Sequence, residues 1–416
     1  MDTVAVATPP VISNQSTDPG QVSPPSDPGA ASAKRGWGCI QCSLPAERTV
    51  ASLDFDTTEA CNLACSYCFM KRQKRTVHMD VATGKNAVDW LLAASGNAHD
   101  LSIHFMGGEP LLRFDFIKQI VQYGTCRARQ AGKNIQFGAT TNSTLVTDEI
   151  VAFWRHYKMR FHCSIDGIPE VQNANRPMLS GAPSSPAVEK NVPKILAYQP
   201  GVTARATITP RSAPALFESV KYLVKLGFKD MTFIAAANCD WRPEDFQAVG
   251  EQYAKVAEFY IDSLVAGKPL RIGEFDKAVR QLHSPEAGPV GCGAGRGMAM
   301  INAKGDIWPC HRYGPHLCGG QMRLGSLGAP YNDRLRNVFL NTRMAEDYKP
   351  ECKGCPAHLT CTNWCTAECL DCTHNMFDPS GKFCQFAKTF HEQVLNFHNH
   401  LRARHPKILA NLLKEN

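Results

Sequence analysis

The chain has 416 residues, of which 44% are hydrophobic and 20% charged, so it is long enough to bury a large core and to form two or three domains. These proportions exclude a chain that is disordered throughout and a collagen-like or mucin-like chain. The formal charge of +7 is spread along the sequence and does not indicate a nucleic-acid partner. No apolar stretch approaches the roughly 20 residues that cross a bilayer, and the N-terminus lacks the basic-then-apolar layout of a secretory signal, so we predict a cytoplasmic protein without a membrane contact.

Residues 1–36 are predicted to form a disordered tail, because residues 1–35 contain six prolines and five serines and almost no periodic apolar pattern. Beyond the tail, short apolar runs rich in β-branched residues alternate with amphipathic stretches. The predicted strands are Val50–Thr57, Leu101–Gly107, Asn134–Thr140, Arg160–Asp166, Val202–Thr209 and Asp230–Ala236. The predicted helices between them are Ala82–Ser95, Asp115–Ala131, Thr147–Tyr157, Pro186–Tyr198 and Ala213–Leu226.

These six βα units predict an α/β domain over residues 37–270, with a parallel sheet that is either open or curved into a partial barrel. A helix around Phe246–Ala266 would close this domain. Functional groups are then expected at the C-terminal ends of the strands. From Cys292 onward the sequence is rich in glycine and cysteine and has little periodicity, so we predict a small second domain over residues 285–400 whose folding energy comes from metal bonds. A last helix is expected at about Gln385–Arg404.

Cysteine points to the chemistry, because 18 thiols in a chain without an export signal are expected to serve metals, clusters or catalysis. Cys61, Cys65 and Cys68 form a C-x3-C-x2-C pattern directly after the first strand. A structural zinc ion needs four ligands, whereas a four-iron cluster held by three cysteines leaves one iron open for a small molecule. A zinc knuckle with a distant fourth ligand is the alternative. The position in a strand-to-helix loop favours the cluster.

The loop resembles that of the radical S-adenosylmethionine enzymes, in which S-adenosylmethionine binds the open iron and is cleaved to a 5′-deoxyadenosyl radical. The segment from His104 to Pro110 is similar to the GGEP segment of this family, in which paired glycines admit a ligand and a carboxylate accepts from its ammonium group. The resemblance implies a partial (β/α)6 barrel. It also implies cofactor contacts at Tyr67, Gly107, Gly108, Glu109, Asn142, Ser164 and Arg176. Three of these have simpler explanations: Ser164 as a turn cap, Arg176 as a solvated cation and Tyr67 as a packing residue.

The C-terminal cysteines resemble the SPASM extension of the same family, which holds two auxiliary four-iron clusters. The resemblance assigns Cys292, Cys310 and Cys365 to the first auxiliary cluster, and Cys352, Cys355, Cys361 and Cys384 to the second. The sulfatase-maturating branch has an additional cysteine after the counterpart of Cys292 and an aspartate base after that of Cys310. Here the aspartate is replaced by His311, which is either a catalytic residue or one that orients the cluster loop.

Both departures resemble enzymes that install thioether crosslinks in peptides, so we predict a radical S-adenosylmethionine oxidoreductase that modifies a peptide or protein. A one-electron reductant such as ferredoxin or flavodoxin would be its partner. The first alternative is an anaerobic sulfatase-maturating enzyme that oxidises serine or cysteine to formylglycine. The second is a non-catalytic, zinc-bound interaction protein.

Two further C-x2-C pairs match neither cluster pattern. They are Cys39 with Cys42, and Cys369 with Cys372. Two such pairs supply the ligand set of a tetrathiolate zinc site, so we predict that they meet in one. The alternative is that Cys318 or Cys369 completes the first auxiliary cluster.

Overall fold

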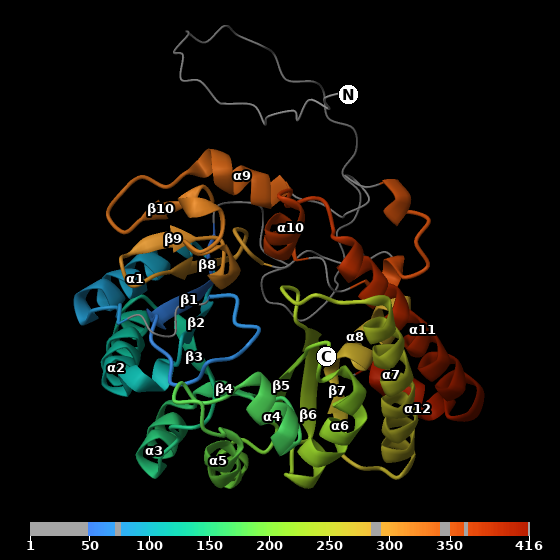
Figure 1. Cartoon of the computed structure of the whole chain (residues 1–416). Helices are drawn as coiled ribbons and strands as arrows, with labels where there is room; N and C mark the ends of the chain where they lie inside the picture. The colour runs from blue at the N-terminus through green and yellow to red at the C-terminus, as the bar shows by residue number, and fades with distance from the viewer. Residues whose placement is uncertain (1–48, 71–75, 284–292, 342–349, 362–364, 415–416) are drawn as a thin grey trace, which may run out of the picture. The chain divides into compact units, whose positions relative to one another are not determined.

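One ten-stranded sheet organises the part of the chain that the computed structural model describes, which is residues 49–70, 76–283, 293–341, 350–361 and 365–414 (Figure 1). The strand order is β10-β9-β8-β1-β2-β3-β4-β5-β6-β7. The strands are β1 (Ser52–Thr58), β2 (Asp100–Gly107), β3 (Asn134–Thr141), β4 (Arg160–Ser164), β5 (Thr203–Ile208), β6 (Asp230–Ala235), β7 (Arg271–Ile272), β8 (Met298–Ile301), β9 (Asp306–Trp308) and β10 (Gly325–Ser326). Strands β1 to β7 are parallel, and each pairs with the next in sequence.

Twelve α-helices are described alongside the sheet. They are α1 (Val81–Ala94), α2 (Phe114–Gln130), α3 (Asp148–Tyr157), α4 (Pro169–Asn175), α5 (Ser185–Tyr198), α6 (Leu216–Lys225), α7 (Pro243–Val265), α8 (Gly273–His283), α9 (Asp333–Asn341), α10 (Thr366–Thr373), α11 (Gly381–Arg404) and α12 (Pro406–Lys414). The outer side of the curved sheet formed by β1 to β6 is covered by helices α1, α2, α3, α5 and α6 (Figure 1). This is the parallel α/β partial barrel that the sequence predicted.

All six predicted strands are confirmed, with ends that agree within two residues. The predicted helix Ala213–Leu226 is a 3-10 turn, η3 (Ala213–Ala215), followed by α6, because Pro214 has no amide donor. The short elements α4, β7 and β8 to β10 have too few residues for a periodic pattern and were not predicted. The predicted tail, residues 1–36, lies outside the described residues.

Side chains alternate between the two faces of the parallel strands, as the pleat requires. One face carries apolar residues that pack under the helices, such as Leu53 and Phe55 on β1 and Phe161 on β4, each at most 1% exposed. The opposite face carries polar residues that line the interior, such as Asp54 on β1 and His104 on β2, which are register partners. The fold therefore encloses a polar interior within an apolar shell.

The C-terminal segment joins the barrel through the sheet. Strand β8 pairs in parallel with β1, with Ser52 opposite Met298, and β9 then pairs antiparallel with β8. Helix α11 packs on α7 and α8 through aromatic rings, with Phe397 5.3 Å from Tyr260 and 5.1 Å from Phe275. The expectation that metal bonds alone supply the folding energy of this segment is therefore wrong, because part of it belongs to the apolar core.

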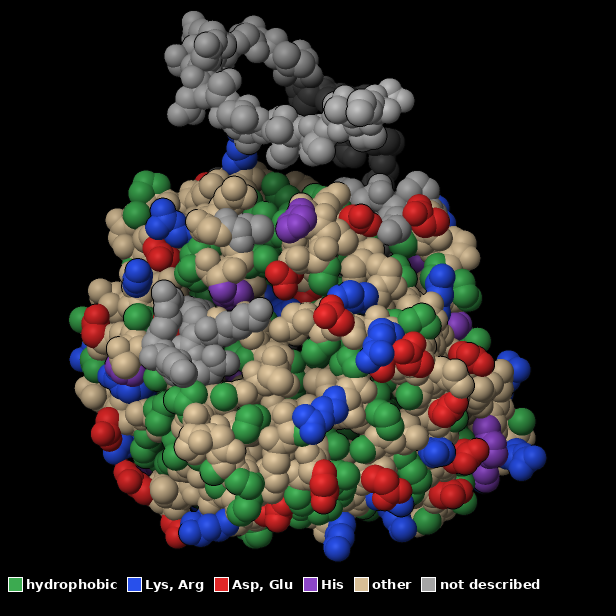
Figure 2. Space-filling view, in the orientation of Figure 1, with side chains coloured by type: hydrophobic (Ala, Val, Ile, Leu, Met, Phe, Trp, Pro, Cys, Tyr) green, Lys and Arg blue, Asp and Glu red, His purple; other side chains and the backbone are tan. Residues whose placement is uncertain are grey.

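Charged side chains of both signs are interspersed on the face of the molecule that Figure 2 shows. This agrees with the even spread of charge along the sequence. Within the described residues, every helix is too short or too polar to span a bilayer.

Candidate active site

A cavity of about 750 Å³ lies against the interior face of the barrel strands. Its wall includes side chains from β1 to β6 and β8, the loop that follows β1, and the segment around His311. The predicted site residues on this wall are Cys61, Cys65, Tyr67, Cys68, Gly107, Gly108, Glu109, Asn142, Ser164, Arg176, His311 and Cys365. Residues far apart in the sequence thus face one volume large enough for a cofactor and part of a substrate.

The three-cysteine loop lies between β1 and α1 and is fixed to the end of α4 and to the segment that follows it. The amide of Ala64 donates to the carbonyl of Pro177 at 2.8 Å, and that of Ser66 donates to the carbonyl of Asn175 at 2.9 Å. Burial raises the pKa of Cys61 to about 12 and that of Cys65 to about 11. Without a cation these thiols stay protonated, so a metal that binds their thiolates must displace protons.

The GGEP segment fixes the cysteine loop from the other side. A Cβ atom on Gly108 would stand 2.0 Å from the carbonyl oxygen of Ala60, and one on Gly107 would stand 2.4 Å from that of Thr58. Gly107 also has a φ of +125°, which disfavours any side chain. Both glycines also line the cavity, so the expectation that they admit a ligand stays a prediction, and the structure adds a second reason for them, which is the close approach of the loop that carries the cysteines.

Glu109 connects the ends of β2 and β3. Its carboxylate accepts hydrogen bonds from the hydroxyl of Thr141 at 2.7 Å, the amide of Asn142 at 2.8 Å and the amide of Leu111 at 3.0 Å. Burial raises the pKa of this carboxyl to about 7. Three of the roughly four acceptor positions of the carboxylate are used within the protein, so one remains for a bound ammonium group.

Asn142 continues from this connection toward the cysteines. Its side-chain amide nitrogen donates to the side-chain oxygen of Asn62 at 2.8 Å and lies 3.9 Å from the sulfur of Cys61. Ser164 ends β4 on the same wall, opposite Arg205 of β5 in the sheet register. The side chain of Asn142 therefore forms its hydrogen bonds within the protein, whereas Ser164 lies on the cavity wall, where a ligand can reach it.

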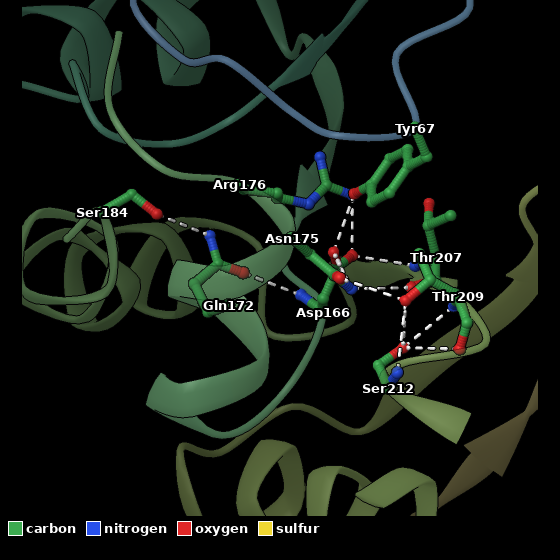
Figure 3. A network of polar contacts seen from close by, with 9 residues as sticks. All are labelled: Tyr67, Asp166, Gln172, Asn175, Arg176, Ser184, Thr207, Thr209 and Ser212. Carbon is green, nitrogen blue, oxygen red and sulfur yellow. Dashed lines mark hydrogen bonds and ion pairs between the residues drawn. The ribbon is translucent and has the colours of Figure 1, made fainter. Parts of the chain in front are cut away.

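Asp166 holds Tyr67 and Arg176 in place, as Figure 3 shows. It is 3% exposed, and its two oxygens accept from Tyr67 at 2.8 Å, Arg176 at 2.9 Å, Asn175 at 3.2 Å and the amide of Thr207 at 2.8 Å. The guanidinium carbon of Arg176 lies 5.3 Å from the centre of the Tyr67 ring. The sequence analysis did not assign this aspartate, although its place two residues after Ser164, just past a strand end, was a usable signal.

The guanidinium group of Arg176 indicates which kind of ligand the cavity can bind. Its side chain is buried, and among the described residues no acceptor reaches its Nε–H group. A buried donor without an acceptor is costly, so this position fits an anionic or polar group of a bound cofactor. Three thiols and an unsatisfied guanidinium donor on one cavity wall match the groups of an iron–sulfur cluster and of S-adenosylmethionine.

His311 faces the cavity from the C-terminal segment. Its Nδ1 atom lies 3.0 Å from the Oδ2 atom of Asp54, a buried residue of β1 that the sequence analysis missed. The next residue, Arg312, pairs with Glu368 of α10 at 2.7 Å and lies 4.3 Å from the ring centre of Phe69, which follows the third cysteine of the loop. The segment after Cys310 therefore contacts both the barrel and the three-cysteine loop.

A second group of missed residues lies deeper in the barrel. His104 contacts Thr140 at 2.8 Å, and its ring centre is 5.9 Å from that of His162. Burial lowers the pKa of both imidazoles, that of His162 to about 4. Arg205 lines the same wall from β5. The strands that carry these residues alternate apolar and polar positions, which was a usable signal for a polar interior.

The described cysteines that were predicted to hold auxiliary clusters lie on two sets of elements. The Arg312–Glu368 ion pair links the segment after Cys310 to the helix after Cys365, and a 2.7 Å contact between Thr360 and His391 links the segment before Cys361 to α11, which contains Cys384. Cys352 and Cys355 belong to the same turn, since the amide of Cys355 donates to the carbonyl of Cys352 at 3.2 Å.

The predicted ligands Cys292, Cys39 and Cys42 lie outside the described residues. Cys369 is buried in α10, and Cys372 is half-buried there. Within the described part of the chain, no three His, Cys, Asp or Glu side chains converge on a point that one metal ion would occupy. A four-iron cluster spreads its thiolates over separate irons.

Comparisons with known proteins agree with this geometry. Residues 55–236 match the family model of the Radical SAM superfamily. An uncharacterized protein of Methanocaldococcus jannaschii is 35% identical over 176 residues, which are 42% of this chain and 59% of that protein, so the chain spans less than two thirds of this relative. A cysteine-type anaerobic sulfatase-maturating enzyme of Clostridium perfringens is 22% identical over 374 residues, which are 83% of this chain and 97% of that enzyme.

A solved structure, native anSMEcpe with bound AdoMet and Cp18Cys peptide, has the same fold. Its TM-score to this chain is 0.68 at 20% identity, and the match covers 85% of this chain and 99% of that one.

Proposed function

We propose that this chain, a radical SAM enzyme of the oxidoreductase type whose radical SAM domain spans residues 55–236, installs a thioether or another crosslink in a peptide or protein. One observation carries the proposal. A single cavity has the Cys61 loop on one wall and His311 and Cys365 of the C-terminal segment on another. A substrate in that cavity contacts the cofactor groups and the C-terminal segment at the same time.

Cys61, Cys65 and Cys68 would hold a four-iron cluster. The other predicted cofactor residues, among them Glu109, Ser164 and Arg176, would hold S-adenosylmethionine. When bound, these groups supply a 5′-deoxyadenosyl radical that removes a hydrogen atom from the substrate. Arg176 would bind the carboxylate of S-adenosylmethionine through the buried N–H group that has no acceptor among the described residues.

The chain itself orients the reactants and excludes water. Asp166 fixes the positions of Arg176 and Tyr67 through four hydrogen bonds. Apolar side chains cover another part of the cavity wall, among them Met106, Met300 and Ile234. A dry, pre-arranged site holds a reactive hydrogen close to the cofactor and keeps water away from radicals.

His311 would act on the substrate from the C-terminal segment, as a catalytic residue. Its contact with Asp54 orients the imidazole ring and leaves Nε2 directed away from that carboxylate. His311 stands where the sulfatase-maturating branch has an aspartate. This difference favours a crosslink over formylglycine.

Oxidation of a serine or cysteine to formylglycine is the second candidate function. The observation that favours it is the sulfatase-maturating relative from Clostridium perfringens, which matches over 97% of its own length. Two short peptides discriminate between the candidates: one carries the cysteine-containing segment of a sulfatase, and the other carries cysteine outside such a segment. Formation of an aldehyde in the first favours formylglycine. Loss of two hydrogens in the second without an aldehyde favours a crosslink.

The C-terminal cysteines would hold two auxiliary four-iron clusters, with Cys292, Cys310 and Cys365 on the first and Cys352, Cys355, Cys361 and Cys384 on the second. The pairs Cys39–Cys42 and Cys369–Cys372 would hold zinc. Ferredoxin or flavodoxin would supply the electron.

The first experiment measures iron, sulfide and zinc per chain after reconstitution without oxygen, and then 5′-deoxyadenosine formation with dithionite. We expect about twelve irons with matching sulfide. Replacing Cys68 by Ala should remove about four irons and abolish 5′-deoxyadenosine, whereas the matched change at Cys126, an exposed cysteine of α2, should alter neither. Replacing Cys39 by Ala should lower zinc and leave iron unchanged. Zinc without iron would overturn the proposal.

A further inference from the structure

Arg205 is a cavity-lining cation without a partner. It lies on β5, and its side chain is exposed to the cavity. Among the residues that the structure describes, no acceptor forms a hydrogen bond or an ion pair with its guanidinium group. Two other arginines of the same cavity are paired, Arg176 with Asp166 and Arg312 with Glu368. Arg205 therefore presents to the cavity a positive charge that no described residue pairs with, and Arg160 at the start of β4 presents another.

The neighbouring carboxyl groups favour the charge of Arg205 electrostatically, but neither forms a direct contact with it within the described residues. Asp54 attracts Arg205 electrostatically, but its carboxylate contacts His311 at 3.0 Å. Glu274 accepts a hydrogen bond from the amide of Phe233, and burial raises its pKa to about 8, so most of it is neutral near pH 7. Burial lowers the pKa of Arg205, yet a guanidinium group stays charged at neutral pH.

A hollow with further hydrogen-bonding capacity adjoins Arg205. The buried Nδ1 atom of His162 has no partner among the described residues, and the low pKa of this imidazole leaves it neutral, with one N–H to donate. Gly138 lines the same cavity and packs closely on its neighbours, since a Cβ atom there would stand 3.0 Å from Nδ1 of His104 and 2.8 Å from the carbonyl of Arg160. A planar anion is the ligand that such a wall accepts.

We propose that Arg205, together with His162, binds a carboxylate of the substrate, so that the enzyme selects an acidic group close to the residue it modifies. This rests on the proposed function. S-adenosylmethionine has one carboxylate, and Arg176 already offers it a buried donor. Arg205 is opposite Ser164 in the sheet register, so a substrate carboxylate bound there lies beside the predicted cofactor residues. The guanidinium fork matches a carboxylate in a bidentate geometry.

The test measures binding of small probes to the reconstituted enzyme with S-adenosylmethionine present, by calorimetry or ligand-observed NMR. N-acetylglutamate α-amide presents a side-chain carboxylate, N-acetylalanine presents a C-terminal carboxylate, and N-acetylglutamine α-amide is the neutral control. We expect one of the acids to bind with a Kd on the order of 1 mM and the neutral control at least tenfold more weakly. The better acid identifies the source of the carboxylate.

Arg205→Gln should weaken binding of that acid at least tenfold, and Arg205→Lys should weaken it less. Arg160→Gln is the matched control, since it removes the same charge from the same cavity about 13 Å further along β4. Equal binding of acid and neutral probe, or an equal loss in both Gln variants, would overturn the proposal. So would a loss of S-adenosylmethionine affinity with acid binding retained, which would assign Arg205 to the cofactor.

A separate readout isolates the proposed function. Arg205→Gln should still form 5′-deoxyadenosine from S-adenosylmethionine when no peptide is present. If the wild-type enzyme cleaves S-adenosylmethionine but binds the acids no better than the neutral control, the substrate inference falls and the radical enzyme stands.

Discussion

Replacing Asp166 by Asn tests the buried network that positions Tyr67 and Arg176. The side chain keeps its shape but loses its charge, and its new NH2 group faces donors that the carboxylate accepted, including Tyr67 at 2.8 Å and Arg176 at 2.9 Å. Arg176 is 8% exposed, so its charge is left buried without compensation. Removing one partner of a buried ion pair costs about 3–5 kcal/mol, and we expect the free energy of unfolding to fall by that amount.

Urea unfolding of the reconstituted protein under anaerobic conditions measures this loss, together with the affinity for S-adenosylmethionine. The matched control is Glu149→Gln, which breaks the Lys118–Glu149 pair of similar length, 3.0 Å, between side chains that are 31% and 68% exposed. An exposed pair contributes less than about 1 kcal/mol. If Asp166→Asn costs no more than Glu149→Gln, the network does not hold Arg176 in the way described.

Three further predictions follow from burial and packing. Burial raises the pKa of Glu274 to about 8 from about 4.5, so its contribution to stability is full below pH 4.5 and is lost as the pH rises toward 8. The Tm of the wild type should therefore fall relative to that of Glu274→Gln between about pH 5 and pH 8, and parallel curves would contradict this. Gly108→Ala, whose Cβ would stand 2.0 Å from a carbonyl of the cysteine loop, should lower iron bound on reconstitution, whereas Gly201→Ala, with no atom within 4 Å, should not. Phe397→Ala should cost about 3–5 kcal/mol in urea unfolding because this ring is 1% exposed against α7 and α8, and a loss below 1 kcal/mol would contradict the packing described.

The strands and helices of the barrel could be predicted well because the sequence patterns that indicate them are local. Each strand is a short run bounded by turn residues, and each helix has an apolar stripe, so both signals lie within about a dozen residues. The cysteine loop follows for the same reason, since Cys61 and Cys68 are seven residues apart and directly follow a strand. Local spacing also identified the segment around Gly108. It did not reveal that the glycines accommodate the backbone at Ala60, because that contact joins two loops.

The polar interior was missed, although the sequence contains its signature. Strand β5 alternates Ala204, Arg205, Ala206 and Thr207, and β4 alternates Phe161 and His162 in the same way. In a parallel sheet covered by helices on one face, the apolar positions belong under the helices, so the polar positions must face an enclosed volume. Reading the strands by face rather than by total hydrophobicity would have predicted the charged and imidazole side chains of the cavity.

The connection between the two halves of the chain could not be predicted from spacing. Asp54 and His311 are 257 residues apart, and they meet because β8 pairs with β1 and thereby fixes where the segment after Cys310 begins. The pairing of β8 with β1 spans four residue pairs, and a strand this short has too weak a sequence pattern to be predicted. It nevertheless determines which C-terminal side chains face the cavity. The resemblance to a family therefore identified the parts of the site, while the sheet register determines that they share one cavity.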